Sequence, residues 1–176
     1  MKSIFVINGS ASHHSSNQKL IELFAELTND LFNLRVFSGL KLLPHFDPQL
    51  SIDNTPKAIL DFRQEIATAD GVLICTPEYV FSIPSGLKNA IEWCVSTTVF
   101  SQKPTGLITA SANGEKGHLE LQMIMETLMA NFSADTTLLI PGIKAKIDEQ
   151  GNFTDNKTKA DLFRFVDGFD KLIQQR

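Results

Sequence analysis

The sequence is poor in cysteine, has no excess of basic residues and contains no long apolar run. Its two cysteines, Cys75 and Cys94, offer neither a disulfide framework nor paired zinc ligands, so we expect both to be reduced and buried. The 16 lysines and arginines are outnumbered by 20 aspartates and glutamates, which argues against a nucleic-acid binder. No stretch approaches the ~20 apolar residues that span a bilayer, and Ile4–Ile7 is too short for a signal-peptide core. We therefore expect a cytoplasmic protein with no nucleic-acid or membrane partner.

Motifs of hydrolytic and metal-dependent chemistry are missing as well. There is no Gly-x-Ser-x-Gly elbow, no His-Glu-x-x-His pair and no Gly-Lys-Ser/Thr phosphate loop. The adjacent pair His13 and His14 has no carboxylate close by in the sequence, and adjacent residues in a loop seldom aim both rings at one ion. We predict no bound metal and no catalytic acid or base.

The residues that are present indicate one α/β domain covering residues 1–176. No linker rich in proline, glycine or serine divides the 176 residues, and 43% of them are hydrophobic. Short apolar runs alternate with helical patterns along the chain. We predict strands at 3–8, 34–37, 71–75, 105–110 and 136–140, with helices after each, their apolar stripes ending near Leu31, Ile66, Cys94, Phe132 and Ile173.

The strands show little polar alternation, which is typical of a parallel sheet covered by helices on both faces. Right-handed crossovers then give a doubly wound sandwich, and five strands suit the flavodoxin-like order 2-1-3-4-5. Ligands of such sheets bind beyond the carboxyl ends of the strands, near strands 1 and 3. Three loops at that edge therefore become the candidates for function.

The loop after strand 1, residues 9–17, combines a glycine, four serine hydroxyls and an asparagine with the start of a helix. Backbone N–H groups and the helix dipole attract anions there, so the loop is a candidate phosphate cradle. A solvated loop with ordinary helix capping is the alternative.

The loops after strands 3 and 4 favour a flat ring as the ligand. The only tyrosine, Tyr79, lies between Pro77 and Pro84, which restrict the backbone of the loop. In the next loop, Asn113 and Gly114 permit positive φ and a close approach of the backbone. Each loop could instead be a plain structural turn, with Tyr79 packed on the protein body.

Taken together, these loops resemble the NADPH-dependent FMN reductase family over roughly residues 3–140. The specific part is the middle motif, and Leu43-Pro44-His45-Phe46 is similar to the family's leucine-proline loop. The motifs read Gly9-Ser10-x-x-x-x-Ser15-x-Asn17 and Thr76-Pro77-Glu78-Tyr79-x-x-Ser82-x-Pro84-x-x-Leu87-Lys88-Asn89-Ala90-Ile91-Glu92-Trp93.

The resemblance implies an enzyme that passes hydride from NADPH or NADH through bound FMN to a quinone, a flavin or a similar small acceptor. It also implies a homodimer or homotetramer. Carried over position by position, the FMN phosphate would be held by Ser10, Ser15, Ser16 and Asn17. The isoalloxazine ring would be lined by Pro77, Glu78, Tyr79 and Val80, with Ser111, Asn113 and Gly114 closing the far side.

One departure from the family pattern concerns the FMN phosphate, and two alternatives to the reductase remain open. The family often carries arginine two residues after the Gly-Ser pair, where this chain has Ser12, so a positive charge near the phosphate is missing. Such a charge-assisted bond contributes ~1.5–3 kcal/mol, or about ten- to a hundredfold in affinity. The alternatives are a flavodoxin-like electron carrier and a flavin-free interaction protein.

Overall fold

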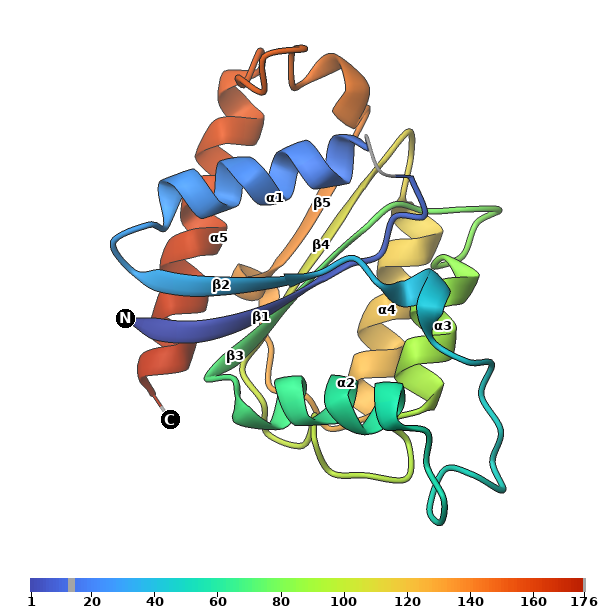
Figure 1. Ribbon diagram of the computed structural model, residues 1–176. Coiled ribbons are helices and arrows are strands. Elements are labelled where there is room, and N and C mark those ends of the chain that lie inside the picture. The colour runs from blue at the N-terminus through green and yellow to red at the C-terminus, as the bar shows by residue number, and fades with distance from the viewer. Residues whose placement is uncertain (13–14, 176) are drawn as a thin grey trace.

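A computed structural model describes residues 1–12 and 15–175 and contains a five-stranded parallel sheet (Figure 1). The strand order is β2-β1-β3-β4-β5, which confirms the predicted order and the doubly wound fold. His13 and His14, considered above as possible ligands, lie outside the described residues. The strands are β1 (Lys2–Asn8), β2 (Phe32–Phe37), β3 (Gly71–Thr76), β4 (Thr105–Ser111) and β5 (Thr137–Pro141).

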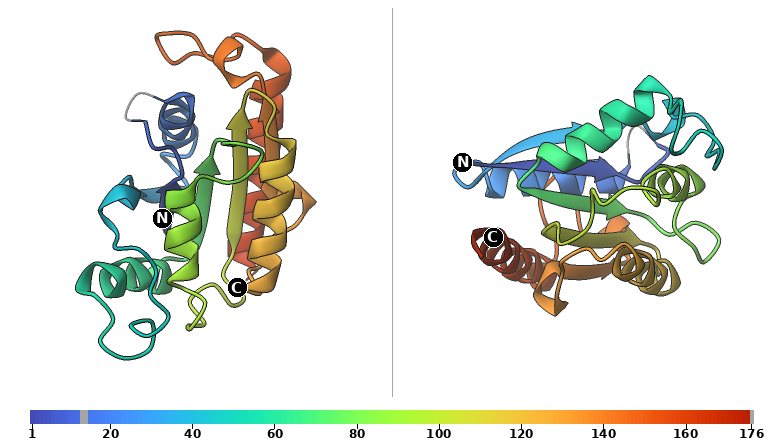
Figure 2. Two further views of the ribbon diagram at one scale, coloured as in Figure 1. Left: turned by 90° about the vertical axis from the view of Figure 1, so that its right-hand side faces the viewer. Right: turned by 90° about the horizontal axis from the view of Figure 1, so that it is seen from below.

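Helices cover both faces of this sheet, as the two further views in Figure 2 show. α1 and α5 lie on one face, and α2, α3 and α4 lie on the other. The helices are α1 (Ser16–Leu27), α2 (Lys57–Thr68), α3 (Ser85–Glu92), α4 (Glu115–Thr127) and α5 (Asn156–Gln174), with 3-10 turns η1 (Leu40–Leu42), η2 (Ala134–Thr136) and η3 (Ile143–Ala145).

Two apolar cores follow from the alternation of side chains along each strand. In β1, Ile4 and Val6 face the α1/α5 layer, whereas Phe5 and Ile7 face the α2/α3/α4 layer. Every residue of the central strand β3 is buried. A strand enclosed on both faces must be apolar throughout, which is why its sequence shows no alternation.

The helix ends differ from the sequence prediction at three places, one of them α3, which ends at Glu92 before the predicted stripe end at Cys94. The predicted stripe of the first helix ran to Leu31, but α1 ends at Leu27 and Leu31 is exposed just before β2. Likewise, α4 ends at Thr127, and Phe132 packs on the core from a connecting segment. Apolar spacing identifies which residues reach the core, and a turn can bring a residue there as well as a helix can.

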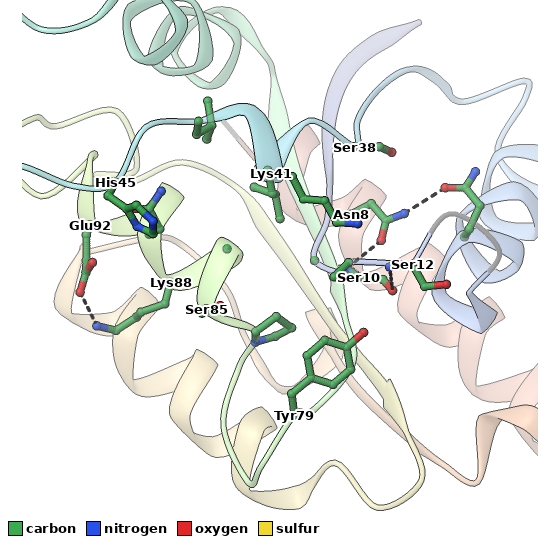
Figure 3. Close-up of a pocket in the computed structure, with 18 residues that line it drawn as sticks. Asn8, Ser10, Ser12, Ser38, Lys41, His45, Tyr79, Ser85, Lys88 and Glu92 are labelled. Atoms are coloured by element: carbon green, nitrogen blue, oxygen red, sulfur yellow. Dashed lines mark hydrogen bonds and ion pairs between the residues drawn. The ribbon is translucent and has the colours of Figure 1, made fainter.

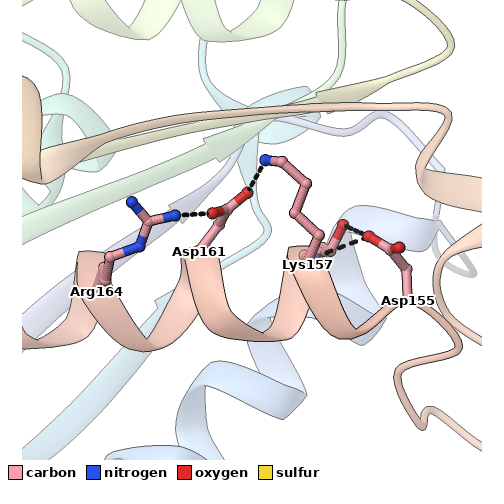
Figure 4. Close-up of polar contacts among 5 residues, drawn as sticks. Asp155, Lys157, Asp161 and Arg164 are labelled. Carbon is pink, nitrogen blue, oxygen red and sulfur yellow. Dashed lines mark hydrogen bonds and ion pairs between the residues drawn. The ribbon is translucent and has the colours of Figure 1, made fainter.

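Local side-chain contacts define the start of α5 (Figure 4). The carboxylate of Asp155 accepts a 2.8 Å hydrogen bond from the N–H of Thr158 and so caps the helix. Asp161 forms ion pairs with both Lys157 and Arg164 on the exposed side. Such surface pairs add little stability, so the apolar face of α5 fixes its position.

The carboxyl ends of β1 and β3 lie against each other, and Gly9 makes this possible. Its N–H donates a 2.8 Å hydrogen bond to the carbonyl of Cys75. A Cβ atom at Gly9 would lie 2.3 Å from the Oγ1 atom of Thr76, so only glycine fits. The loop after β1 therefore begins directly above the sheet edge.

Among the described residues, no helix has the length and apolar character needed to cross a bilayer.

Candidate functional site

A cavity of ≈ 600 Å³ opens at this edge, between the loop after β1, η1 and the start of α3 (Figure 3). Its volume falls in the range of about 300–1,000 Å³ that is usual for small-molecule sites. The lining residues are Asn8, Gly9, Ser10, Ala11, Ser12, Gln18, Ser38, Leu40, Lys41, Leu43, His45, Tyr79, Pro84, Ser85, Gly86, Lys88, Asn89 and Glu92.

The loop after β1 is held in shape by the buried side chain of Asn8. Its Oδ1 atom accepts a 3.0 Å hydrogen bond from the N–H of Ser10, and its Nδ2 atom donates to Gln18 at 2.9 Å. The Oγ atom of Ser10 accepts a 3.2 Å hydrogen bond from the N–H of Ser12. Asn8 and Gln18 thus fix the conformation of the loop from the end of β1 and the first turn of α1. The sequence prediction did not include either residue, because neither belongs to a motif.

The start of α1 lies beside this loop and carries three predicted phosphate ligands. Ser15 caps the helix, its Oγ atom accepting a 3.1 Å hydrogen bond from the N–H of Gln18. The N–H groups of Ser16 and Asn17 precede the first hydrogen-bonded turn and have no partner within the helix. The first turn contains no acidic residue, so its electrostatics favour an anion.

The side chain of Asn17 serves the fold. It is buried, and its Nδ2 atom donates a 3.0 Å hydrogen bond to the carbonyl of Ala110 in β4. Its Oδ1 atom lies 3.4 Å from the thiol of Cys75 in β3. The amide therefore ties α1 to the two central strands, and what Asn17 can offer a phosphate is its backbone N–H.

Glu78 directs its carboxylate at the start of α4. The two oxygens accept hydrogen bonds from the N–H groups of Gly114, at 3.3 Å, and Gly117, at 2.7 Å. Gly114 is the N-cap residue and has no side chain that could do this itself, and its φ of 92° requires glycine. A carboxylate thus occupies the N-terminus of α4, whereas the N-terminus of α1 has none.

A tight turn follows Glu78 and carries Tyr79 at the mouth of the cavity. Tyr79 and Ser82 exchange backbone hydrogen bonds of 2.9 and 3.1 Å across the turn. The two residues between them, Val80 and Phe81, have φ values of 52° and 60°, and their side chains are 95% and 72% exposed. Tyr79 lines the cavity, while Val80 is not among its lining residues.

The remaining predicted residues surround the contact between Glu78 and α4. Pro77 is buried, and Asn113 is exposed at the turn before Gly114. The hydroxyl of Ser111 donates a 3.4 Å hydrogen bond to the carbonyl of Glu78. The structure thus joins the loops after β3 and β4, and of the eleven predicted residues Ser10 and Tyr79 line the cavity itself.

The opposite wall of the cavity comes from the segment after β2, packed on α3. The carbonyl of Pro44 accepts hydrogen bonds from Trp93 Nε1 at 2.8 Å and Asn89 Nδ2 at 2.9 Å. The ring of Phe46 packs edge-on against Trp93, with centroids 5.3 Å apart. The buried guanidinium of Arg63 donates to the carbonyl of Trp93 and braces the same wall.

This wall contributes polar side chains that the sequence prediction did not include. Lys41, His45, Lys88 and Glu92 all line the cavity, and Lys88 forms a 2.8 Å ion pair with Glu92. A signal was available, because β2 neighbours β1 in the predicted order. The segment after β2 therefore had to reach the same sheet edge.

Burial favours the neutral form of three titratable side chains, Cys75, Cys94 and His118. Burial raises the pKa of the Cys75 thiol, and it raises the pKa of Cys94 to about 12. Burial also lowers the pKa of His118, whose Nδ1 atom lies 2.9 Å from the hydroxyl of Thr109. The thiols are inert toward nucleophilic chemistry in this state.

Within residues 1–12 and 15–175, no three His, Cys, Asp or Glu side chains converge as metal ligands.

Comparison with protein families agrees with this geometry. The family described as NADPH-dependent FMN reductase matches residues 2–142. That range includes all five strands and the three loops at their carboxyl ends. The match therefore covers the whole edge where the cavity opens.

Individual relatives match over nearly their full length. The chain is 29% identical to a 2-hydroxy-1,4-benzoquinone reductase of Burkholderia sp, over 98% of this chain and 97% of the relative. It is 29% identical to an NADPH:quinone oxidoreductase of Arabidopsis thaliana, over 90% of this chain and 85% of the relative. Among solved structures, the flavoenzyme FerB, an NAD(P)H:(acceptor) oxidoreductase from Paracoccus denitrificans, superposes with a TM-score of 0.78. The two share 25% identity over 99% of this chain and 98% of FerB.

Proposed function

The chain belongs to the NADPH-dependent FMN reductase family, whose members are oxidoreductases that use FMN and NAD(P)H, and we propose that it delivers electrons to a quinone. A flavin or another small acceptor of similar shape would use the same open site. The named relatives that reduce quinones support this choice of acceptor. When bound, FMN supplies the chemistry by accepting a hydride and passing two electrons on.

The residues at the sheet edge fit FMN. To a phosphate, the loop after β1 and the start of α1 offer the hydroxyls of Ser10 and Ser15 and the N–H groups of Ser16 and Asn17, which have no partner within the helix. The N-terminus of α4 is taken by Glu78, whereas no acidic residue lies in the first turn of α1, so the start of α1 is open to an anion. The cavity next to it has the volume of a cofactor site.

In this proposal Tyr79 lies against the ring and leaves its other face open. Pro77, Glu78 and Val80 shape the same side through their backbone, and Ser111, Asn113 and Gly114 close the far side. Glu78 keeps the two loops together by capping α4, which orients the ring-binding edge. The open face lets NAD(P)H and the acceptor use one place in turn, and no protein acid or base is needed for hydride transfer.

The visible spectrum of the purified protein tests the proposal. We expect a flavin spectrum that bleaches when NADPH or NADH is added under nitrogen and returns when a benzoquinone follows. A colourless protein that takes up no added FMN would support a flavin-free interaction protein instead. Bound flavin that NAD(P)H does not reduce would support an electron carrier.

The same proposal includes a homodimer or homotetramer formed through an exposed apolar patch. Phe81 lies in a groove of ≈ 370 Å³ with Leu119 and Met123 of α4, and the last two side chains are 62% and 61% exposed. Such apolar clusters usually mark interaction surfaces. Sedimentation of the protein and of Phe81→Ser tests this, because the variant should shift toward monomer.

We also place the protein in the cytoplasm, where NAD(P)H is supplied and free thiols stay reduced.

A further inference from the structure

The cavity wall opposite the loop after β1 carries one cation that faces this loop. Lys41 belongs to η1 and lines the same cavity as Ser10 and Ser12. Figure 3 shows its side chain extending from η1 toward Asn8 and Ser10. β2, which leads into η1, pairs directly with β1, so the fold itself brings Lys41 to the serine loop.

Lys41 has no internal partner in the described part of the chain. Its ammonium group makes no hydrogen bond and no ion pair there. The other lysine of the cavity, Lys88, is bound to Glu92 at 2.8 Å, so its charge is already balanced. Lys41 is therefore the lysine of this cavity whose charge is available to a ligand.

The part of this loop that the structure describes provides only neutral donors for an anion. Its described residues from Asn8 to Ser12 are amide, glycine, serine and alanine, and those from Ser15 to Gln18 are serine, asparagine and glutamine. A phosphate monoester carries nearly two negative charges at neutral pH. Neutral donors leave that charge uncompensated, whereas a lysine serves well as a point charge for phosphate.

We propose that Lys41 supplies the positive charge that holds the FMN phosphate at the serine loop, a role that rests on the FMN binding proposed above. The charge comes from the segment after β2 instead of from the loop. FMN therefore bridges η1 and the loop after β1, and Lys41 selects phosphorylated flavin over riboflavin, which lacks the phosphate.

The test compares how the full-length protein, freed of flavin, binds FMN and riboflavin, each followed by flavin fluorescence at low ionic strength. We expect Lys41→Ala to weaken FMN binding about tenfold and to leave riboflavin binding unchanged. Lys41→Arg should bind FMN like the parent protein. Adding Ser12→Arg to Lys41→Ala should restore FMN binding, because position 12 lines the same cavity.

A matched control is Lys57→Ala, which removes the same charge from the start of α2 and lies outside the cavity. It should leave both affinities unchanged. Added salt should weaken FMN binding of the parent protein more steeply than that of Lys41→Ala, because screening acts on the lysine–phosphate pair.

Two results would overturn the role of Lys41. One is an unchanged preference for FMN over riboflavin in Lys41→Ala. The other is unchanged FMN binding together with a raised KM for NADPH, which would assign Lys41 to the phosphates of the nicotinamide nucleotide. If the parent protein binds no FMN at all, the proposed function fails first and this inference fails with it. If the parent protein binds FMN and Lys41→Ala binds it equally well, this inference is refuted while the proposed function stands.

Discussion

The carboxylate of Glu78 accepts a 2.7 Å hydrogen bond from the backbone N–H of Gly117, and it accepts a second from Gly114. A residue of the loop after β3 thus caps the helix that follows β4. A matching contact runs the other way, since Glu120 of α4 accepts hydrogen bonds from Ser82 and from the N–H of Ile83. The turn that carries Tyr79 is therefore anchored to α4 at both ends.

Removing the cap should destabilise the protein. We expect Glu78→Ala to lower the free energy of unfolding by about 1–2 kcal/mol, because two N–H groups at the start of α4 lose their acceptor. Urea denaturation of the flavin-free protein measures this. Glu115→Ala is the control, since Glu115 is exposed in the same first turn and should cost at most about 0.5 kcal/mol. Equal effects of the two variants would contradict the capping role.

Two glycine substitutions should act in opposite directions. Gly9→Ala places a Cβ atom 2.3 Å from Thr76 Oγ1, so the strand ends must separate, and we expect a loss of about 1–3 kcal/mol. Gly86→Ala lies within α3, where the nearest atom to its Cβ is 3.6 Å away on Leu40. Alanine should stabilise that helix by up to about 1 kcal/mol. Thermal unfolding of both flavin-free variants measures the difference, and a neutral Gly9→Ala would show that the strand ends are not in contact.

Replacing Val80 should relieve backbone strain. A β-branched residue is disfavoured at its φ of 52°, whereas asparagine is favoured at this place in a two-residue hairpin turn. We expect Val80→Asn to raise the free energy of unfolding by about 1 kcal/mol. Val95→Asn serves as the comparison, because Val95 is also exposed and has no positive φ. The idea fails if both changes have the same effect on the urea midpoint.

Stability should depend on pH through His118. Burial lowers its pKa below the ordinary value of 6.5, so the unfolded chain takes up a proton more readily than the folded protein does. Stability is then constant above that pH and decreases as the pH falls below it, by at most about 1.4 kcal/mol per pH unit. His118→Asn, whose amide can still meet Thr109, should flatten the decrease. Parallel curves for both proteins, from urea titrations at several pH values, would exclude His118 as the source.

The sequence was a good guide to the sheet and a poorer guide to the cavity. Buried strands such as β3 need apolar residues at every position, so the pattern in the sequence is a direct record of their burial. The hydrogen-bond partner of a polar side chain, by contrast, cannot be read from the local sequence pattern. Asn17 and Glu78 were both predicted to bind the cofactor, and their side chains bond to the carbonyl of Ala110 and to the start of α4. Those partners depend on how the strands align, which no local pattern contains.

The far wall of the cavity escaped prediction for a related reason. The segment after β2 has no regular spacing, and its shape follows from contacts with α3 that lie 43–49 residues away in the chain. Between Lys41 and His45, the carbonyl of Pro44 is bound to Trp93 and Asn89, which holds this part of the segment against the end of α3. Knowing the strand order was enough to place the segment at this edge, but not to tell which of its side chains face inward.

The indole contact with Pro44 also gives the molecule a built-in optical probe. Trp93 is the only tryptophan, it is fully buried, and its Nε1 atom binds the segment that forms the cavity wall. Ultraviolet emission from a single buried indole comes from one environment, and it overlaps the absorption of oxidised flavins. Occupancy of the neighbouring cavity can therefore be followed by energy transfer, without labelling the protein or adding a tag.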